Sequence, residues 1–314
     1  MTVLSTGSSP GTRGAAGGRG SQRRPRQRRR WTGWGFVGPF LVVFLFALVA
    51  PVLYAVYLSL FQDKLIGGNR FAGLANYRQA LGDSQFWSAF GRVAVFLAVQ
   101  VPVMLVLALA VALALDSARL YWAPLYRLGI FLPYAVPAVV AALMWGFMYG
   151  TQFGLIGDLD RVLHQSLPDP FSNALVLPAI GNIVTWEFVG YNMLIFFSAL
   201  RVVPGELYEA AELDSASAWR VVWHIKLPAL RPAILIATIF SIIGSFQLFN
   251  EPNILKPLSP DTISSYFTPN MYAYNLSFAG QEYNYSATIA IVMGVVTMVI
   301  AYAVQRVGAR NQEA

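Results

Sequence analysis

The chain has 314 residues, of which 56% are hydrophobic and only 12% are charged, with a mean hydropathy of +0.54. A soluble domain carries about twice that charged fraction, so the composition excludes an ordinary soluble protein. No cysteine is present, which excludes disulfides and thiol chemistry. The net charge of +7 does not indicate nucleic-acid binding, because eight of the 22 basic residues precede the first apolar segment.

Six apolar segments along the chain are each long enough to cross a hydrocarbon core of about 30 Å. We therefore predict an all-α membrane protein with six transmembrane helices, at about 34–61, 86–115, 123–150, 173–200, 231–250 and 285–306. Several of these segments contain proline, which membrane helices tolerate where neighbouring helices or water satisfy the freed carbonyls. The prolines, including Pro133 and Pro137, indicate kinks.

The basic residues predict the orientation. With the amino terminus inside, sixteen of the 22 lysines and arginines lie on the cytoplasmic side and six on the outer side. This asymmetry matches the tendency of basic residues to stay in the cytoplasm, so both termini are expected to be cytoplasmic. Residues 1–30 are rich in Gly, Ser and Arg and predict a disordered tail that lies against anionic lipid.

Aromatic residues are frequent in the predicted outer loops, at about 62–85, 151–172 and 251–284. They indicate either an aromatic belt at the membrane interface or a docking surface for an external partner.

A polar stretch between the fourth and fifth spans, Glu209 to Pro232, is predicted to lie in the cytoplasm. Pro204 and Gly205 end the fourth span, and a short helix then begins with acidic residues in its first turn, where the helix dipole favours them. Ser215 or Ser217 could cap a second, amphipathic helix over 218–226, and Leu227-Pro228 is expected to end it. The segment is either a connector lying on the membrane surface or a docking site for another protein.

Three motifs carry a family resemblance: Glu209-Ala210-Ala211, Asp214-Ser215-Ala216 and Ile225-Lys226-Leu227-Pro228. They resemble the EAA loop of binding-protein-dependent ABC importer permeases, whose pattern reads EAA, Asp-Gly-Ala and Ile-x-Leu-Pro. Further stretches resemble the carbohydrate-uptake branch of that family, the maltose- and glycerol-phosphate-type permeases: Leu132–Pro137, Trp186–Pro204 and Ser245–Asn250. Ser215 departs from the pattern, because the family usually has glycine there. A left-handed serine costs about 1 kcal/mol.

The resemblance implies a type I ABC importer permease fold with a cytoplasmic coupling helix that fits an ATPase subunit. The implied division is a tail (1–30), a transmembrane permease domain (31–308) with its coupling loop at about 204–230, and a cytoplasmic C-terminal tail (309–314). The residues expected to contact or position the ATPase are Glu206, Tyr208, Glu209, Ala210, Ala211, Asp214, Ser215, Ala216, Leu227 and Pro228.

The resemblance also implies the partners. They are two ATP-binding subunits, a second and different permease, and an extracytoplasmic sugar-binding protein, assembled at a bacterial inner membrane. ATP and Mg²⁺ would be bound by the partner ATPases. This chain is expected to bind neither, since its three lysines precede Leu65, Leu227 and Pro257 and cannot form a phosphate-binding loop.

Polar residues inside the predicted spans are candidates for a substrate pathway, because they are costly in lipid. Side-chain amides can hydrogen-bond to the hydroxyls of a sugar, and aromatic rings can stack on its apolar C–H surfaces. Helix–helix hydrogen bonding is the alternative role. The candidates are Tyr134, Trp186, Glu187, Tyr191, Asn192, Phe246, Gln247, Phe249, Asn250 and Glu251.

Two other functions were weighed. An ion-coupled secondary transporter would use Glu187 as its coupling site, although the sequence has no convincing internal repeat. The sequence does not support a membrane-embedded enzyme, because the predicted spans contain neither a Ser/His/Asp catalytic constellation nor residues with the spacing of metal ligands. No metal site is therefore predicted.

Overall fold

The computed structural model describes residues 28–64, 68–117 and 121–313. The predicted tail at 1–30 therefore lies almost entirely outside the described residues. The chain divides into two compact units, residues 1–52 and 53–314, and each is described by itself.

The described part of the first unit is helical. It comprises α1 (Arg28–Phe44), the π-helical segment η1 (Leu45–Val49) and the first residues of α2 (Ala50–Ser59). Apolar side chains cover all sides of this helix and are exposed, as expected for a helix that faces lipid.

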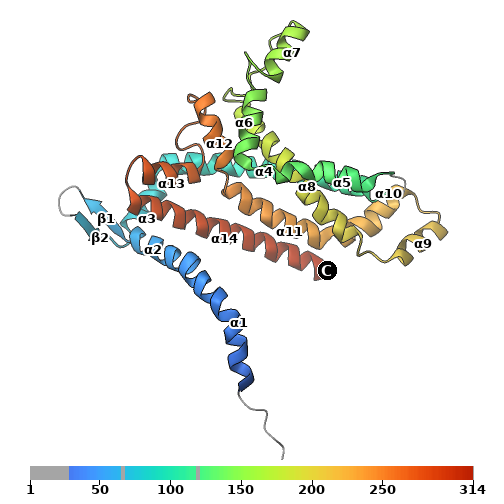
Figure 1. Cartoon of the computed structure of the whole chain (residues 1–314), viewed down its shortest axis with the longest axis horizontal. Coiled ribbons are helices and arrows are strands. Elements are labelled where there is room, and N and C mark those ends of the chain that lie inside the picture. Colours follow the sequence, from blue (N-terminus) through green and yellow to red (C-terminus); the bar gives the residue numbers. More distant parts are fainter. Residues whose placement is uncertain (1–27, 65–67, 118–120, 314) are drawn as a thin grey trace, which may run out of the picture. The chain divides into compact units, whose positions relative to one another are not determined.

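The second unit is a helical bundle with one short hairpin (Figure 1). The hairpin pairs β1 (Phe61–Lys64) with β2 (Gly68–Phe71) in antiparallel register. The remaining elements are α3 (Ala75–Gly82), α4 (Ser84–Leu115), α5 (Ala123–Phe131), η2 (Leu132–Ala135), α6 (Ala138–Met148), α7 (Leu155–Leu163), α8 (Val176–Leu200), α9 (Gly205–Leu213), α10 (Ala218–Val221), η3 (Val222–Lys226), α11 (Leu227–Phe246), α12 (Asn250–Leu255), η4 (Lys256–Leu258), α13 (Pro269–Phe278) and α14 (Tyr283–Glu313).

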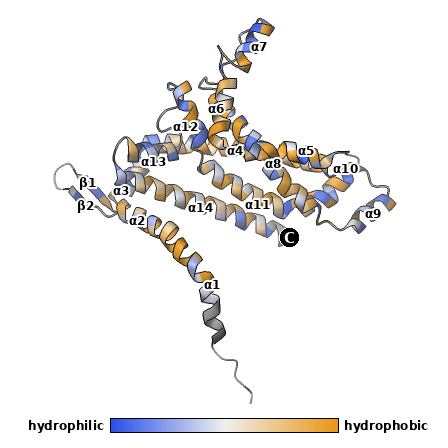
Figure 2. Ribbon diagram, in the orientation of Figure 1, coloured by the Kyte–Doolittle hydropathy of each residue, from blue (hydrophilic) through white to orange (hydrophobic). Residues whose placement is uncertain are grey.

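The prediction of six spans is confirmed in number when one bent helix pair is taken as a single span. In the described residues, five helical stretches are long and apolar enough to cross a membrane: Gly33–Ser59, Ser84–Leu115, Val176–Leu200, Ala218–Leu258 and Tyr283–Arg310. Figure 2 shows hydrophobic residues along the long helices of the bundle, and hydrophilic residues on α9 beyond them.

The predicted third span, 123–150, is not one continuous helix. It breaks between Ala135 and Ala138, and its two halves are bent by 95°. Val136 precedes Pro137 and has an extended ψ of 129°, as the proline ring requires of the residue before it. The prolines therefore break the helix instead of only kinking it.

The predicted end of the helix over 218–226, at Leu227-Pro228, is wrong. The chain stays helical from α10 through η3 into α11, and the fifth span begins earlier than residue 231. Pro228 lies in the first turn of α11, and the preceding segment is a π-helix in which Leu227 donates its N–H to the carbonyl of Val222. The π-helical turn accommodates the proline by shifting the hydrogen-bond pattern before it.

The core of the bundle lies between α4, α8 and α11. Small residues of α4, Ala108 and Ala112, are fully buried against Met193 and Phe196 of α8 and Leu230 of α11. A second cluster joins the start of α4 to α11, α13 and α14. α4 and α11 are thus packed into a cluster near each of their ends.

Gly190 sets the distance between α8 and the bent pair. A Cβ atom at this position would lie 2.0 Å from the carbonyl oxygen of Ile130, so no larger residue fits without moving the two elements apart. The glycine places α8 directly against α5 and η2, next to the break.

Asp83 ties together three helices at the end of the bundle that carries the hairpin. One carboxylate oxygen caps α4 by accepting from the N–H groups of Gln85 and Phe86, and the other accepts from the hydroxyls of Tyr272 and Tyr285, each at 2.6 Å. Burial acts to raise the pKa of Asp83, but the four hydrogen bonds outweigh it and hold the pKa below its ordinary value. The ionised carboxylate is the form that these donors stabilise.

Asp83→Asn should lower the free energy of unfolding at pH 7 by about 1.5–3 kcal/mol, because charge-assisted hydrogen bonds become neutral ones. Since the folded-state pKa lies below the unfolded value of about 3.9, the contribution is present above that pH and is lost as the pH falls through the folded pKa. Thermal unfolding of the detergent-solubilised protein between pH 7 and pH 2.5 measures this. The exposed Asp63→Asn serves as the matched control, and equal behaviour of the two variants would contradict the assignment.

Candidate functional site

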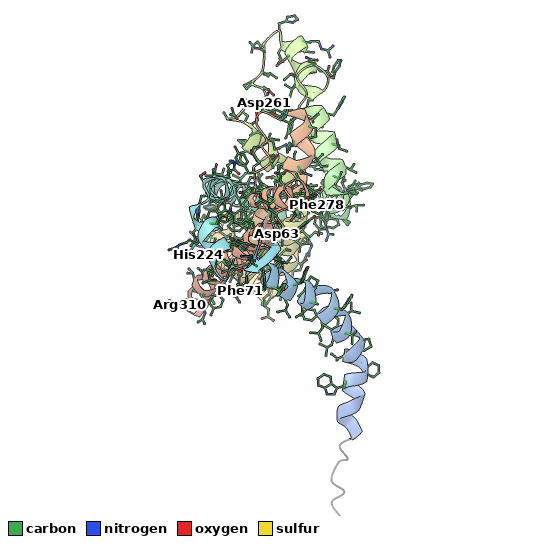
Figure 3. All side chains as sticks on the ribbon, turned by 90° about the vertical axis from the view of Figure 1, so that its left-hand side faces the viewer. Asp63, Phe71, His224, Asp261, Phe278 and Arg310 are labelled. Carbon is green, nitrogen blue, oxygen red and sulfur yellow. The ribbon has the colours of Figure 1, made fainter. Side chains whose placement is uncertain are left out.

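The segment predicted as a coupling loop lies at one end of the bundle, opposite the hairpin. It consists of α9, a tight turn and the continuous helix α10–η3, and it extends beyond the long helices (Figure 1). Figure 3 views the bundle from the hairpin end, where Asp63 and Phe71 are labelled. The last turns of α14 lie toward the same end as α9, with Gly308 against the side chain of Leu235 in α11.

Most of α9 is exposed, and only Tyr208 and Ala211 are half-buried. Glu206, Glu209, Ala210 and Leu213 follow the i, i+3, i+4, i+7 spacing of a single helical face, and all four are exposed. The opposite side carries Tyr208, which is half-buried against the bundle. On this face the helix presents Glu206, Glu209, Ala210 and Leu213, while Leu207 and Glu212 are exposed beside it.

Ser215 adopts the left-handed conformation, with a φ of +52°. It ends α9 in a two-bond cap, in which Ala216 donates to the carbonyl of Ala211 at 2.9 Å and Ser215 donates to that of Glu212 at 3.0 Å. The turn geometry that glycine would favour is thus kept with serine in its place. Asp214 and Ser215 are exposed, while Ala211 and Ala216 are half-buried.

Ser217 caps α10, as one of the two predicted capping serines, by accepting from the N–H of Arg220 at 3.4 Å. Two exposed tryptophans on this helix were missed by the sequence interpretation. Trp219 and Trp223 are 69% and 52% exposed, and their rings meet edge-on at 5.6 Å. Their i, i+4 spacing was the signal that could have identified them.

An ion pair attaches this segment to the bundle. Lys226 donates to Asp116, just after α4, at 2.6 Å, and both side chains are almost buried. The ring of Tyr208 lies 5.6 Å from the Lys226 ammonium group. Burial raises the pKa of the Tyr208 hydroxyl, and the nearby Asp116 carboxylate adds to the increase while Arg201 opposes it.

Of the predicted pathway residues, the structure brings Tyr134 and Tyr191 together. Their rings stack at 4.8 Å beside the break in the bent pair. Phe188, which the prediction missed although it lies three positions before Tyr191, meets Tyr134 edge-on at 5.7 Å. Tyr134 and Phe188 are 42% and 37% exposed, so these three rings form an accessible patch, here called the aromatic patch.

Trp186 and Glu187 lie just before Phe188 in α8. Trp186 meets Trp145 of α6 edge-on at 5.9 Å. Glu187 is only 3% exposed, and its Oε2 has no hydrogen-bond partner among the described residues. Glu251 is also buried and lies in the first turn of α12, which contacts both α6 and α8. Such buried carboxylates are costly in a membrane and mark candidates for function.

The other predicted pathway residues do not join the aromatic patch. Asn192 is buried, donating to the Phe188 carbonyl and to the sulfur of Met104, so it acts in helix–helix contact. Phe246 and Gln247 border a separate groove of about 620 Å³ between α11 and α14. Phe249 lies against Tyr274 of α13, and Asn250 is exposed at the start of α12.

In the described ranges, no three His, Cys, Asp or Glu side chains are grouped in a way that could hold a metal ion.

A family model described as binding-protein-dependent transport system inner membrane component matches residues 71–312. The chain is 31% identical to the lactose transport system permease protein LacF of Rhizobium radiobacter, over 86% of this chain and 91% of that protein. It is 30% identical to the diacetylchitobiose uptake system permease protein NgcF of Streptomyces coelicolor, over 91% and 85%. The crystal structure of a bacterial alginate ABC transporter, in complex with an alginate pentasaccharide-bound periplasmic protein, contains a similar fold. Its TM-score is 0.80, with 18% identity over 91% of this chain and 97% of that one.

Ser215→Gly should raise the stability of the α9 cap by about 1 kcal/mol, because glycine has no Cβ atom to oppose a positive φ. An increase of about 2 °C in the apparent Tm is expected. Ser215→Val, with a branched Cβ, should lower it. A Tm that falls with glycine, or an equal Tm for both variants, would contradict the left-handed cap.

Proposed function

Since this chain belongs to the family of binding-protein-dependent transport system inner membrane components, we propose that it is the membrane-spanning subunit of an ATP-driven sugar importer. It is a multi-pass inner-membrane protein, and in the proposed orientation both termini and α9 are cytoplasmic. An extracytoplasmic binding protein would deliver the sugar to the opposite end of the bundle.

The observation that carries the proposal is the exposed face of α9. Glu209 and Ala210 lie on a short helix that projects from the end of the bundle, and both side chains are exposed in the described structure. Ala210 is small and lets another backbone approach closely, and the flanking carboxylates favour a basic groove on the partner. Trp219 and Trp223 add exposed apolar area of the kind that anchors protein interfaces.

The energy source in this proposal is a separate ATPase. The sequence has no lysine placed for a phosphate-binding loop, so nucleotide and Mg²⁺ would be bound by two partner ATPase subunits. This chain would be non-catalytic and would pass the movement of those subunits to the spans through α9. A second permease would complete the translocation pathway, since the described residues of this chain supply five or six spans.

A neutral mono- or oligosaccharide is the proposed substrate. LacF and NgcF are named for the transport of lactose and of diacetylchitobiose. The aromatic patch offers ring faces of the kind that stack on the apolar C–H surface of a sugar, with the hydroxyls of Tyr134 and Tyr191 beside them. An ion-coupled mechanism through Glu187 has no further observation in its favour.

Glu209→Lys should abolish retention of the ATPase subunits, because it reverses a charge at the centre of the exposed α9 face. The measurement is co-purification of the subunits from membranes in mild detergent, together with ATP hydrolysis by the purified complex. Asp261→Lys, the same charge change at an exposed residue outside the coupling segment, is the matched control and should retain both. Equal ATPase retention by the two variants would contradict docking at α9.

Tyr134→Ala should reduce ATP-dependent sugar uptake about fivefold, because stacking contributes on the order of 1 kcal/mol and a factor of ten corresponds to about 1.4 kcal/mol. Tyr134→Phe keeps the ring and should retain most of the uptake. The assay uses proteoliposomes containing the full complex and its binding protein, with labelled lactose, trehalose and diacetylchitobiose. Failure to import any neutral sugar, or unchanged uptake by the alanine variant, would contradict this assignment.

A further inference from the structure

Three residues fasten α9 and the start of α11 to the end of α4. Asp116 follows the last turn of α4, Lys226 ends the π-helical segment η3, and Tyr208 lies on the inward side of α9. Lys226 donates to Asp116 at 2.6 Å, and the Tyr208 ring lies against the ammonium group at 5.6 Å. These three residues are called the latch below.

The ion pair is shielded from water. The Lys226 and Asp116 side chains are 13% and 11% exposed, although they belong to a region where most side chains of α9 and α10 are exposed. By contrast, the pair between Asp158 and Arg161 on α7 is 63% and 73% exposed. A shielded pair resists screening by salt and holds a defined geometry better than an exposed pair does.

Asp116 does not stabilise α4 on its own. The C-terminal end of a helix carries partial negative charge, so a carboxylate there is unfavourable unless a cation compensates for it. Lys226 supplies that cation from a position 110 residues away in the sequence. The pair therefore stabilises the relation between two elements, α4 and the α10–η3–α11 helix.

Tyr208 gives the latch a second possible arrangement. Its hydroxyl is buried and has no hydrogen-bond partner among the described residues. The Asp116 carboxylate and Arg201 are the charged groups that act on it. A small movement of α9 that brought the hydroxyl to Asp116 would satisfy the orphaned donor, and buried donors are rarely left unpaired.

We propose that the latch of Asp116, Lys226 and Tyr208 positions α9 on the bundle and passes its displacement to α4. This inference rests on the proposed function for the source of the displacement. The attachment of α9 to α4 is a property of this chain alone and can be measured without any partner. Asp116, Lys226 and Tyr208 are positioning residues, since none of them lies on the exposed face of α9.

The first experiment measures the attachment in the purified chain. The sequence contains no cysteine, so spin labels at Glu212→Cys on α9 and Val106→Cys on α4, both exposed, are the only labels introduced. One narrow distance distribution is expected in the otherwise unchanged chain. Asp116→Asn and Lys226→Gln should broaden it, and the exchanged pair Asp116→Lys with Lys226→Asp should narrow it again. Equal widths in all four proteins would overturn the inference.

The second experiment measures coupling in the full complex in proteoliposomes. Asp116→Asn and Lys226→Gln should retain the ATPase subunits but transport about tenfold less sugar per ATP hydrolysed, and the exchanged pair should restore most of that ratio. Asp158→Asn, in the exposed pair on α7, is the matched control and should leave the ratio unchanged. An unchanged ratio in the latch variants would overturn transmission through the latch.

The two proposals fail in different ways. A complex in which the unchanged chain retains no ATPase would contradict the proposed function and, with it, transmission of an ATPase-driven movement. The spin-label distances would still decide whether the latch attaches α9 to α4.

Tyr208→Phe is the last variant in the spin-label experiment, because it removes the unpaired hydroxyl but keeps the ring over Lys226. It should leave the distance distribution narrow, and broadening would contradict the role given to the ring.

Discussion

The close approach of α8 to its neighbours is the constraint on which the rest of the bundle depends. Gly190 allows the backbone of α8 to lie against Ile130, and the fully buried alanines of α4 allow the same on the other side. In a membrane the hydrophobic effect gives little drive for helices to associate, so small residues at the contacts let van der Waals attraction act over the greatest area. Because α8 is held in this way, the break at the bent pair is placed beside it, and Tyr134 stacks on Tyr191.

The same helix carries the two regions of functional interest toward opposite parts of the bundle. Phe188 and Tyr191 of the aromatic patch lie on its middle turns, whereas Arg201 at its end lies near Tyr208 of α9. α8 spans the distance between them, and the short turn at 201–204 joins it to α9. This end of the bundle is tied to α4 by the pair of Lys226 and Asp116, and α4 and α8 share the largest part of the core.

In the segment predicted as a coupling loop, some features follow from the local sequence and others do not. The acidic first turn, the serine caps and the small residues after Glu209 are local signals, and the helix–turn–helix they predict is present. Ser215 keeps the left-handed turn because two cap hydrogen bonds from Ser215 and Ala216 hold it there. The continuation of the helix through Pro228 was not foreseen, since a π-helical turn before a proline has no recognised sequence signal.

The sequence by itself determined the class of the molecule and the number of its spans, because the length of an apolar segment is a local property. The roles of individual polar residues were decided only by the tertiary structure. Tyr134 and Tyr191 meet, whereas Asn192 turns to Met104 and Gln247 borders a different groove. Lys226 and Asp116 are 110 positions apart, and no periodicity relates them. Contacts between distant segments depend on how whole helices pack, and that is a property of the folded bundle.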